Sequence, residues 1–178
     1  MKSINYGRQE INQEDIAAVN EALTADYLTQ GPLVNKFEDD FKQFVGSAEA
    51  VAVGNATQAL HLANIALGVK NKMKVITTPI SFIATSNGTL YAGGDVTFVD
   101  IDEKTYCLDA NKVEDLLKKS APGTYAGISP VSFAGYPVNT EDLRQVADKY
   151  GLWIIEDSCH APGAKFKTSQ GTWSKTGS

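Results

Sequence analysis

The sequence predicts an α/β protein with a mostly parallel sheet and helices on both of its faces. From residue 50 onward, short apolar runs alternate with segments of helical period. Parallel neighbours need long crossover connections, and these helical segments supply them. The length of 178 residues suits one domain with a substantial core, or one domain and an incomplete neighbour. Ligands of such sheets bind at the carboxyl ends of the strands, so the residues that follow strands are the candidates for chemistry.

Two helices are expected before this alternation begins. Residues 13–25 place apolar side chains at helical spacing behind Asn12, which suits the N-cap position. The turn at 28–32 (LTQGP) separates them from a helix over 36–45, because proline after glycine prevents either helix from continuing. The second helix aligns three rings that we expect in the core: Phe37, Phe41 and Phe44. Residues 1–30 then form an N-terminal helical segment, and residues 31–178 form the larger domain.

The rest of the chain repeats the order strand, turn and helix. Strands are predicted at 50–53 (AVAV), 75–78, 97–99, 128–131 and 152–155. Helices are predicted at 57–67, at 83–92, behind a cap at Asp109, and over the segment from Leu143 to Tyr150. The first of these helices is apolar nearly all round, so we expect it to be buried.

The composition argues against several kinds of partner. Lys and Arg total 16 and Asp and Glu total 21, which gives a net charge of −5. Nucleic acid is a poor partner for this balance, because neutralising phosphates needs clustered cations. No apolar run is long enough to cross a bilayer and no signal-peptide pattern opens the chain, so we expect a cytoplasmic protein without membrane contact. Cys107 and Cys159 are expected to be reduced, and the sequence shows no spacing typical of metal ligands.

The first candidate for chemistry is the turn at 54–57 (GNAT), between a strand and a helix. Small residues allow close approach of an anion, and the first N–H groups of a helix lack internal partners. A phosphate could therefore rest on Ala56 and Thr57. The alternative is a plain tight turn with Thr57 as the N-cap. The segment is neither a Walker loop nor a GxGxxG turn.

Two further candidates follow later strands. Phe82 could stack on a planar ligand, although an aromatic residue between isoleucines is more often simply buried. In IIEDSCHAPG (154–163), Asp157 leaves a strand and His160 follows it three residues later. An acid there can bind a protonated ring nitrogen, and an imidazole can donate to a phenolate-like oxygen. The alternative is a pair of solvated acids with a capping histidine. His61, on an apolar helix, is expected to be a core histidine.

Together these residues suit pyridoxal 5'-phosphate (PLP). This cofactor acts as an electron sink only while its ring nitrogen is protonated, and a buried carboxylate beside that nitrogen raises its pKa. Asp157 would supply the carboxylate, and Ala56 and Thr57 would hold the phosphate. Phe82 would cover one face of the ring, and His160 would bond the ring oxygen.

Four stretches now carry a resemblance to a known family: YLTQGPLVNKFEDDF, AVAVGNATQALHLANIALG, VITTPISFIATSNGTLYAGGDVTFVDIDEKTYCLD and PVSFAGYPVNTEDLRQVADKYGLWIIEDSCHAPGAKF. In this order they resemble the DegT/DnrJ/EryC1/StrS sugar aminotransferases, which are fold-type I PLP enzymes. The opening INYGRQEINQEDIAAVNEAL is most similar to members that aminate UDP-linked 4-keto-6-deoxy amino sugars on the way to pseudaminic acid.

The resemblance implies that part of the enzyme lies beyond Ser178. Members bind the cofactor as a Schiff base to a lysine in a Ser-Phe-His-x-x-Lys segment that this sequence lacks, so no catalytic residue is assigned here. Lys165, Lys167 and Lys175 do not lie in that motif. Residues 31–178 would then be an incomplete large domain without the small domain. We expect the chain alone to be inactive, and to be unstable because sheet edges and apolar helix faces stay uncovered.

The resemblance also implies an activity and partners. Members transfer an amino group, with glutamate as the expected donor, to a nucleotide-linked 4-keto-6-deoxy sugar, and they work as homodimers. Tyr6, Gln30 and Gly31 are the candidates for contacting the sugar nucleotide. Two alternatives stay open. One is a PLP-dependent sugar dehydratase relative with histidine in place of the lysine, and the other is a non-catalytic α/β phosphate-binding module.

Overall fold

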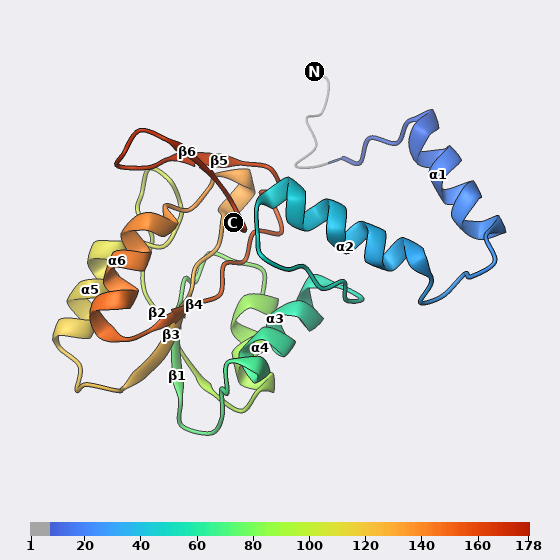
Figure 1. Ribbon diagram of the computed structural model, residues 1–178. Helices are drawn as coiled ribbons and strands as arrows, with labels where there is room; N and C mark the ends of the chain where they lie inside the picture. Colours follow the sequence, from blue (N-terminus) through green and yellow to red (C-terminus); the bar gives the residue numbers. More distant parts are fainter. Residues whose placement is uncertain (1–7) are drawn as a thin grey trace, which may run out of the picture.

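The computed structural model describes residues 8–178 and has the predicted α/β class, with helices on both sides of a central sheet (Figure 1). Four parallel strands form this sheet in the order β2-β1-β3-β4. Their bounds are β1 (Lys74–Thr77), β2 (Asp95–Phe98), β3 (Tyr125–Ser129) and β4 (Trp153–Ile154). Ile76 of β1 pairs with Thr97 on one side and with Ile128 on the other. The strand predictions from residue 75 onward are therefore confirmed, with ends that differ by a few residues.

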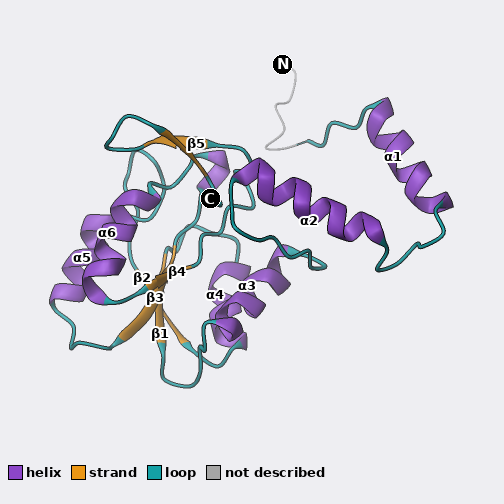
Figure 2. Cartoon of the chain, in the orientation of Figure 1, coloured by secondary structure: helices purple, strands orange, loops and turns teal. Residues whose placement is uncertain are grey.

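Helices α5 (Ala110–Lys118) and α6 (Thr140–Tyr150) cover one face of the sheet, and α3 (Ala56–Ala66) and α4 (Ala84–Tyr91) lie on the other (Figure 2). The main core lies under α5 and α6, where Ile76, Val113, Ile128 and Leu143 are fully buried. Val75 points to the opposite face and is 1% exposed. Burial of consecutive strand residues is what a parallel sheet covered on both faces requires.

Helix α3 is attached to the sheet through α4. Gly88 of α4 has no side chain at the crossing, where a Cβ atom would lie 3.0 Å from the carbonyl carbon of Leu60. The next residue of α4, Thr89, donates its hydroxyl hydrogen to Oδ1 of Asn64, one turn after Leu60 on α3, at 3.0 Å, and both residues are buried. Close approach and a buried hydrogen bond together fix the position of α3 against α4.

Helix α1 (Gln13–Thr24) begins as predicted, because Asn12 and Asp15 form a capping box. Helix α2 (Pro32–Val45) begins four residues before the predicted start at 36, with proline in its first turn, and ends at Gly46 in the left-handed conformation. The prediction that its aromatic stripe lies in the core is wrong. Phe37, Phe41 and Phe44 are 59%, 40% and 49% exposed, because the described residues cover this face only in part: the first two rings stack on each other, and Lys175 lies over the Phe44 ring.

Two further expectations about the N-terminal half are wrong. Residues 50–53 (AVAV) form no strand, because no described strand lies beside them; instead the Ala52 N–H donates to Glu38 Oε1 of α2 at 2.7 Å. Helix α3 is not buried all round, since among its residues only Leu60 and Asn64 are buried while Leu62 and Ile65 are half exposed. Both segments are apolar, but the described residues bury few of their side chains.

A short antiparallel hairpin, β5 (Lys165–Lys167) and β6 (Trp173–Lys175), was not predicted. Its turn is held to α6 by Glu141, whose carboxylate accepts from the Ser169 amide and hydroxyl at 2.7 and 2.6 Å. Lys175 Nζ donates to the carbonyl oxygen of Phe44, which connects the hairpin to α2. No helix within residues 8–178 has the length and apolar character needed to span a bilayer.

Candidate functional site

A cavity of about 260 Å³ lies at the carboxyl ends of the strands, between the start of α3 and the loops that follow β1 and β4. Its lining includes every residue that the sequence suggested for the cofactor: Ala56, Thr57, Phe82, Asp157 and His160. The turn at 54–57 and the acid at 157, a hundred residues apart in sequence, therefore face one space that a single small molecule can occupy.

The amino end of α3 forms one side of this cavity. Asn55 is the N-cap, because its Oδ1 accepts from the Gln58 amide at 3.0 Å, so the alternative that made Thr57 the cap is wrong. The preceding Gly54 amide donates to Gln58 Oε1 at 3.1 Å, which closes the turn. Ala56 and Thr57 thus occupy the first turn, whose N–H groups have no acceptor within the helix and favour a bound anion.

Asp157 forms the opposite side. It continues β4 alongside β3, because its amide donates to the Pro130 carbonyl at 2.9 Å and its carbonyl accepts from the Ser132 amide at 3.0 Å. Its carboxylate is buried, with the residue 5% exposed. Oδ2 accepts from the Thr85 hydroxyl at 2.6 Å and Oδ1 accepts from the Cys159 amide at 3.3 Å. The alternative of a solvated acid is therefore wrong for Asp157.

Glu156, the neighbouring acid, has a structural role. Its Oε1 accepts from the hydroxyls of Ser132 and Ser158 at 2.9 and 2.5 Å, and its Oε2 accepts from the Gly177 amide at 3.1 Å. It does not line the cavity. Of the two adjacent acids, only Asp157 can meet a ligand there.

The aromatic residues of the site are exposed. Phe82 is 69% exposed, so the alternative of a buried core ring is wrong, and a planar ligand could stack on it. His160 is also exposed, and its ring centroid lies 6.5 Å from that of Phe133. His61 is half-buried and not part of the core, so the expectation of a core histidine is wrong; its ring meets the Tyr91 ring edge to face at 5.6 Å.

Sequence reasoning missed two residues beside Asp157. Thr85 is buried in the first turn of α4, four residues after Ser81, and this helical spacing was the available signal. Cys159 lines the cavity next to the acid. Burial, followed by a hydrogen bond to Asp157 and the negative charge of that carboxylate, raises the pKa of the Cys159 thiol to about 12.

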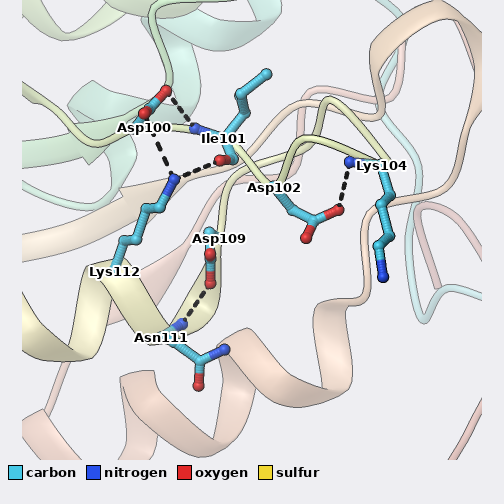
Figure 3. Close-up of polar contacts among 7 residues, drawn as sticks. All are labelled: Asp100, Ile101, Asp102, Lys104, Asp109, Asn111 and Lys112. Atoms are coloured by element: carbon cyan, nitrogen blue, oxygen red, sulfur yellow. Dashed lines mark hydrogen bonds and ion pairs between the residues drawn. The ribbon is translucent and has the colours of Figure 1, made fainter.

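The acids after β2 form local polar contacts that stabilise a loop (Figure 3), and none of them lines the cavity. Lys112 Nζ donates to the Ile101 carbonyl at 2.7 Å and approaches Asp100 Oδ2 at 3.4 Å. Asp102 Oδ1 accepts from the Lys104 amide at 3.0 Å, and Asp109 caps α5 as predicted by accepting from the Asn111 amide at 2.9 Å. The pKa of the Asp100 carboxyl is lowered by the Ile101 amide and by Lys112. These carboxylates accept hydrogen bonds from nearby backbone amides and so stabilise local turns.

The residues suggested for the sugar nucleotide lie elsewhere. Gln30 is exposed and Gly31 caps α2, and neither lines the cavity. Tyr6 lies outside the described residues. The structure therefore brings together the five proposed cofactor residues but not the three proposed substrate residues.

The fold and the cavity define a class of α/β protein in which a cavity lies between a helix N-terminus and a buried strand-end acid. A model of the DegT/DnrJ/EryC1/StrS aminotransferase family matches residues 9–178, so the chain belongs to that family, as its sequence stretches indicated.

Three similar proteins illustrate this membership. The UDP-4-amino-4,6-dideoxy-N-acetyl-beta-L-altrosamine transaminase of Campylobacter jejuni is 40% identical over 164 residues, which cover 92% of this chain and 43% of that protein. The solved structure of Helicobacter pylori PseC, an aminotransferase involved in pseudoaminic acid biosynthesis, matches with a TM-score of 0.85 at 30% identity, over 99% of this chain and 45% of that one. Bacillus subtilis NtdA with bound cofactor PMP matches with a TM-score of 0.77 at 30% identity, over 86% and 35% of the two chains. The chain thus spans less than half the length of these relatives.

Proposed function

We propose that this chain provides the PLP-binding part of a nucleotide-sugar aminotransferase. The observation that supports this most strongly is the cavity that joins the amino end of α3 to the buried carboxylate of Asp157. A phosphate needs unpartnered N–H groups, and a protonated ring nitrogen needs a fixed anion. The two requirements of a phosphorylated pyridine thus meet within one space. On this proposal, residues 31–178 belong to the PLP-binding large domain.

Each side chain of the cavity has a distinct part. Ala56 and Thr57 bind the phosphate through first-turn N–H groups, and the Thr57 hydroxyl adds a donor. Phe82 stacks on one ring face, and its exposure leaves that face accessible. Asp157 would accept a hydrogen bond from the ring nitrogen, and His160 would donate one to the ring oxygen. When bound, PLP supplies an electron sink for carbanions beside the transferred nitrogen.

The lysine that moves the proton in this family has no counterpart at the cavity of the described chain. Lys165 and Lys167 lie on β5 and line a different pocket, and Lys175 contacts Phe44. The residues of this chain therefore bind and orient the cofactor, while proton transfer is assigned to none of them.

The proposed substrates are a nucleotide-linked 4-keto-6-deoxy sugar and glutamate as amino donor. The 40% identity to an altrosamine transaminase supports the sugar class. Gln30 and Gly31, at the start of α2, together with Tyr6 are proposed to contact the sugar nucleotide, and the enzyme is proposed to act as a homodimer. Formation of 2-oxoglutarate from glutamate in the presence of such a sugar, by the full protein, tests the substrate class separately from the cofactor.

Pyridoxamine 5'-phosphate (PMP) tests the cofactor site, because it binds without a covalent bond to lysine. We expect equilibrium dialysis to give a dissociation constant for Asp157→Ala about 10- to 100-fold higher than for the wild type, since a hydrogen bond to a charged group contributes about 1.5–3 kcal/mol. Asp95→Ala, which removes an exposed acid at the amino end of β2, is the control and should bind like the wild type. Equal PMP affinity in Asp157→Ala, with inorganic phosphate still bound, would favour the phosphate-binding module instead.

A further inference from the structure

We propose that Thr85 is the positioning residue for Asp157, and that Ser81 completes a hydrogen-bonded chain that orients this carboxylate toward the cavity. The inference rests on the proposed function, because it assigns a purpose to the orientation of Asp157. Thr85 itself is 1% exposed and does not line the cavity, so it can act on a ligand only through the acid.

The chain of contacts consists of three side chains from two segments. The Thr85 hydroxyl donates to Asp157 Oδ2 at 2.6 Å across 72 positions of sequence. Ser81 Oγ lies 2.5 Å from Thr85 Oγ1, and it also lies 3.0 Å from the Phe82 carbonyl oxygen. The Thr85 amide donates to that same carbonyl at 3.2 Å, which fixes the backbone between the two hydroxyls. The turn that presents Phe82 is thereby connected to the acid.

Counting hydroxyl hydrogens gives the direction of the chain. Thr85 has a single hydroxyl hydrogen and donates it to Asp157 Oδ2, so it can only accept from Ser81. Ser81 also has one hydroxyl hydrogen, which it can donate to Thr85 Oγ1 or to the Phe82 carbonyl. In either case Asp157 accepts from Thr85, and its acceptor role suits a protonated ring nitrogen.

Thr85 also holds the rotamer of Asp157. A short hydrogen bond to a charged group restricts the side chain, so less conformational entropy is lost when a ligand binds. The Cys159 amide holds the other oxygen at 3.3 Å. Without the Thr85 hydroxyl, the carboxylate could turn away from the ring nitrogen.

The test compares two ligands that differ only at the ring nitrogen: PMP and its 1-deaza analogue, in which a C–H group replaces that nitrogen. Dissociation constants are measured by equilibrium dialysis for the wild type, Thr85→Val, Thr85→Ser and Asp157→Ala. We expect Thr85→Val to weaken PMP binding about tenfold, the lower end for a hydrogen bond to a charged group, and to change binding of the analogue by less than about twofold. Thr85→Ser keeps the hydroxyl and should stay within about threefold of the wild type for both ligands.

Thr77→Val is the matched control, because Thr77 is equally buried and its hydroxyl donates to the Ser129 carbonyl and not to Asp157. It should bind both ligands like the wild type. If Thr85→Val does not fold, Ser81→Ala at a half-buried position is used instead. Because Ser81 itself lines the cavity, the readout is the ratio of the two dissociation constants, in which direct contacts shared by both ligands cancel, and we expect a smaller loss that is again selective for PMP. Equal weakening of both ligands, or failure of Thr85→Ser to restore PMP binding, would overturn the positioning role. If Asp157→Ala also leaves PMP binding unchanged, the proposed function fails; if Asp157→Ala weakens it and Thr85→Val does not, only the present inference fails.

Discussion

The rate of alkylation of Cys159 tests the environment of its thiol in the cavity and needs no cofactor. Burial and Asp157 raise the pKa of this thiol from 9.0 to about 12. At pH 8 its thiolate fraction then falls from about one tenth to about 10⁻⁴, a factor of about 1,000. The more basic thiolate is also the better nucleophile, with a Brønsted coefficient of about 0.4–0.5, which restores a factor of about 20. We therefore expect Cys159 to react about 50-fold more slowly than an ordinary cysteine.

The assay follows iodoacetamide incorporation by mass spectrometry of the peptide that contains Cys159. The same protein unfolded in guanidinium chloride supplies the reference rate. Cys159 is exposed as a residue although its thiol is partly desolvated beside Asp157, so the reagent can reach it in the folded state. Cys107 is buried and lies in a separate peptide. Asp157→Ala should accelerate the reaction only in part, since burial is the larger cause and remains.

The pH dependence of the alkylation rate shows whether the thiol pKa is raised. A thiol with a raised pKa should react faster by about a factor of ten per pH unit from pH 8 to 10, whereas an ordinary thiol levels off near pH 9. The raised pKa also stabilises the folded state below pH 9, and this contribution is lost progressively as the pH rises toward about 12. A folded-state rate within about threefold of the reference, or a plateau at pH 9, would refute the reasoning.

Two further predictions concern the scaffold. A Cβ atom at Gly127 would lie 2.1 Å from Cε3 of Trp153. Gly127→Ala should therefore lower the free energy of unfolding, measured by denaturant titration, by about 3 kcal/mol, and a second substitution, Trp153→Leu, should recover part of this loss. An unchanged denaturation midpoint in Gly127→Ala would contradict the packing described. Hydrogen bonds from the Ser169 hydroxyl and amide lower the pKa of Glu141, so the contact between the hairpin and α6 should be present above about pH 4.5 and be lost as the pH falls below the lowered pKa. Amide hydrogen exchange in residues 165–175 can follow this loss, and Glu141→Gln should show fast exchange already at neutral pH. Protection from exchange that does not change with pH in the wild type would count against the contact.

The features that sequence could predict are local ones. Helix caps such as Asn12 and Asp109 depend on a few adjacent residues, and both lie where their spacing indicates. The candidate cofactor residues Phe82, Asp157 and His160 could be grouped because they follow strands, and the carboxyl ends of parallel strands meet at one edge. Ala56 and Thr57 follow no strand, and only the start of a helix indicates them. Asp157 and Thr57 share a cavity although no local pattern connects them.

The features that sequence could not predict depend on distant partners. An apolar run such as 50–53 has the composition of a strand, but strand formation requires a neighbour with free backbone groups, and none lies beside it among the described residues. The stripe of Phe37, Phe41 and Phe44 is an equally valid helical pattern, yet its burial depends on a covering surface. The hairpin at 165–175 has strands of three residues, too short for a reliable alternation.

Helix α4 shows most clearly why periodicity alone cannot describe the site. Its small residues separate two tasks on one rigid element: Gly88 and Thr89 hold α3, whose amino end is the anion-binding side, and Thr85 holds Asp157 on the opposite side. Both sides of the cavity are therefore positioned by adjacent turns of one helix, in which each turn rises about 5.4 Å. None of these three residues contributes to an apolar stripe, so the segment ATSNGTLY has no strong helical pattern. Their importance follows only once the partners at Leu60, Asn64 and Asp157 are known. None of the three residues lines the cavity, so substituting them should change its geometry without changing its lining.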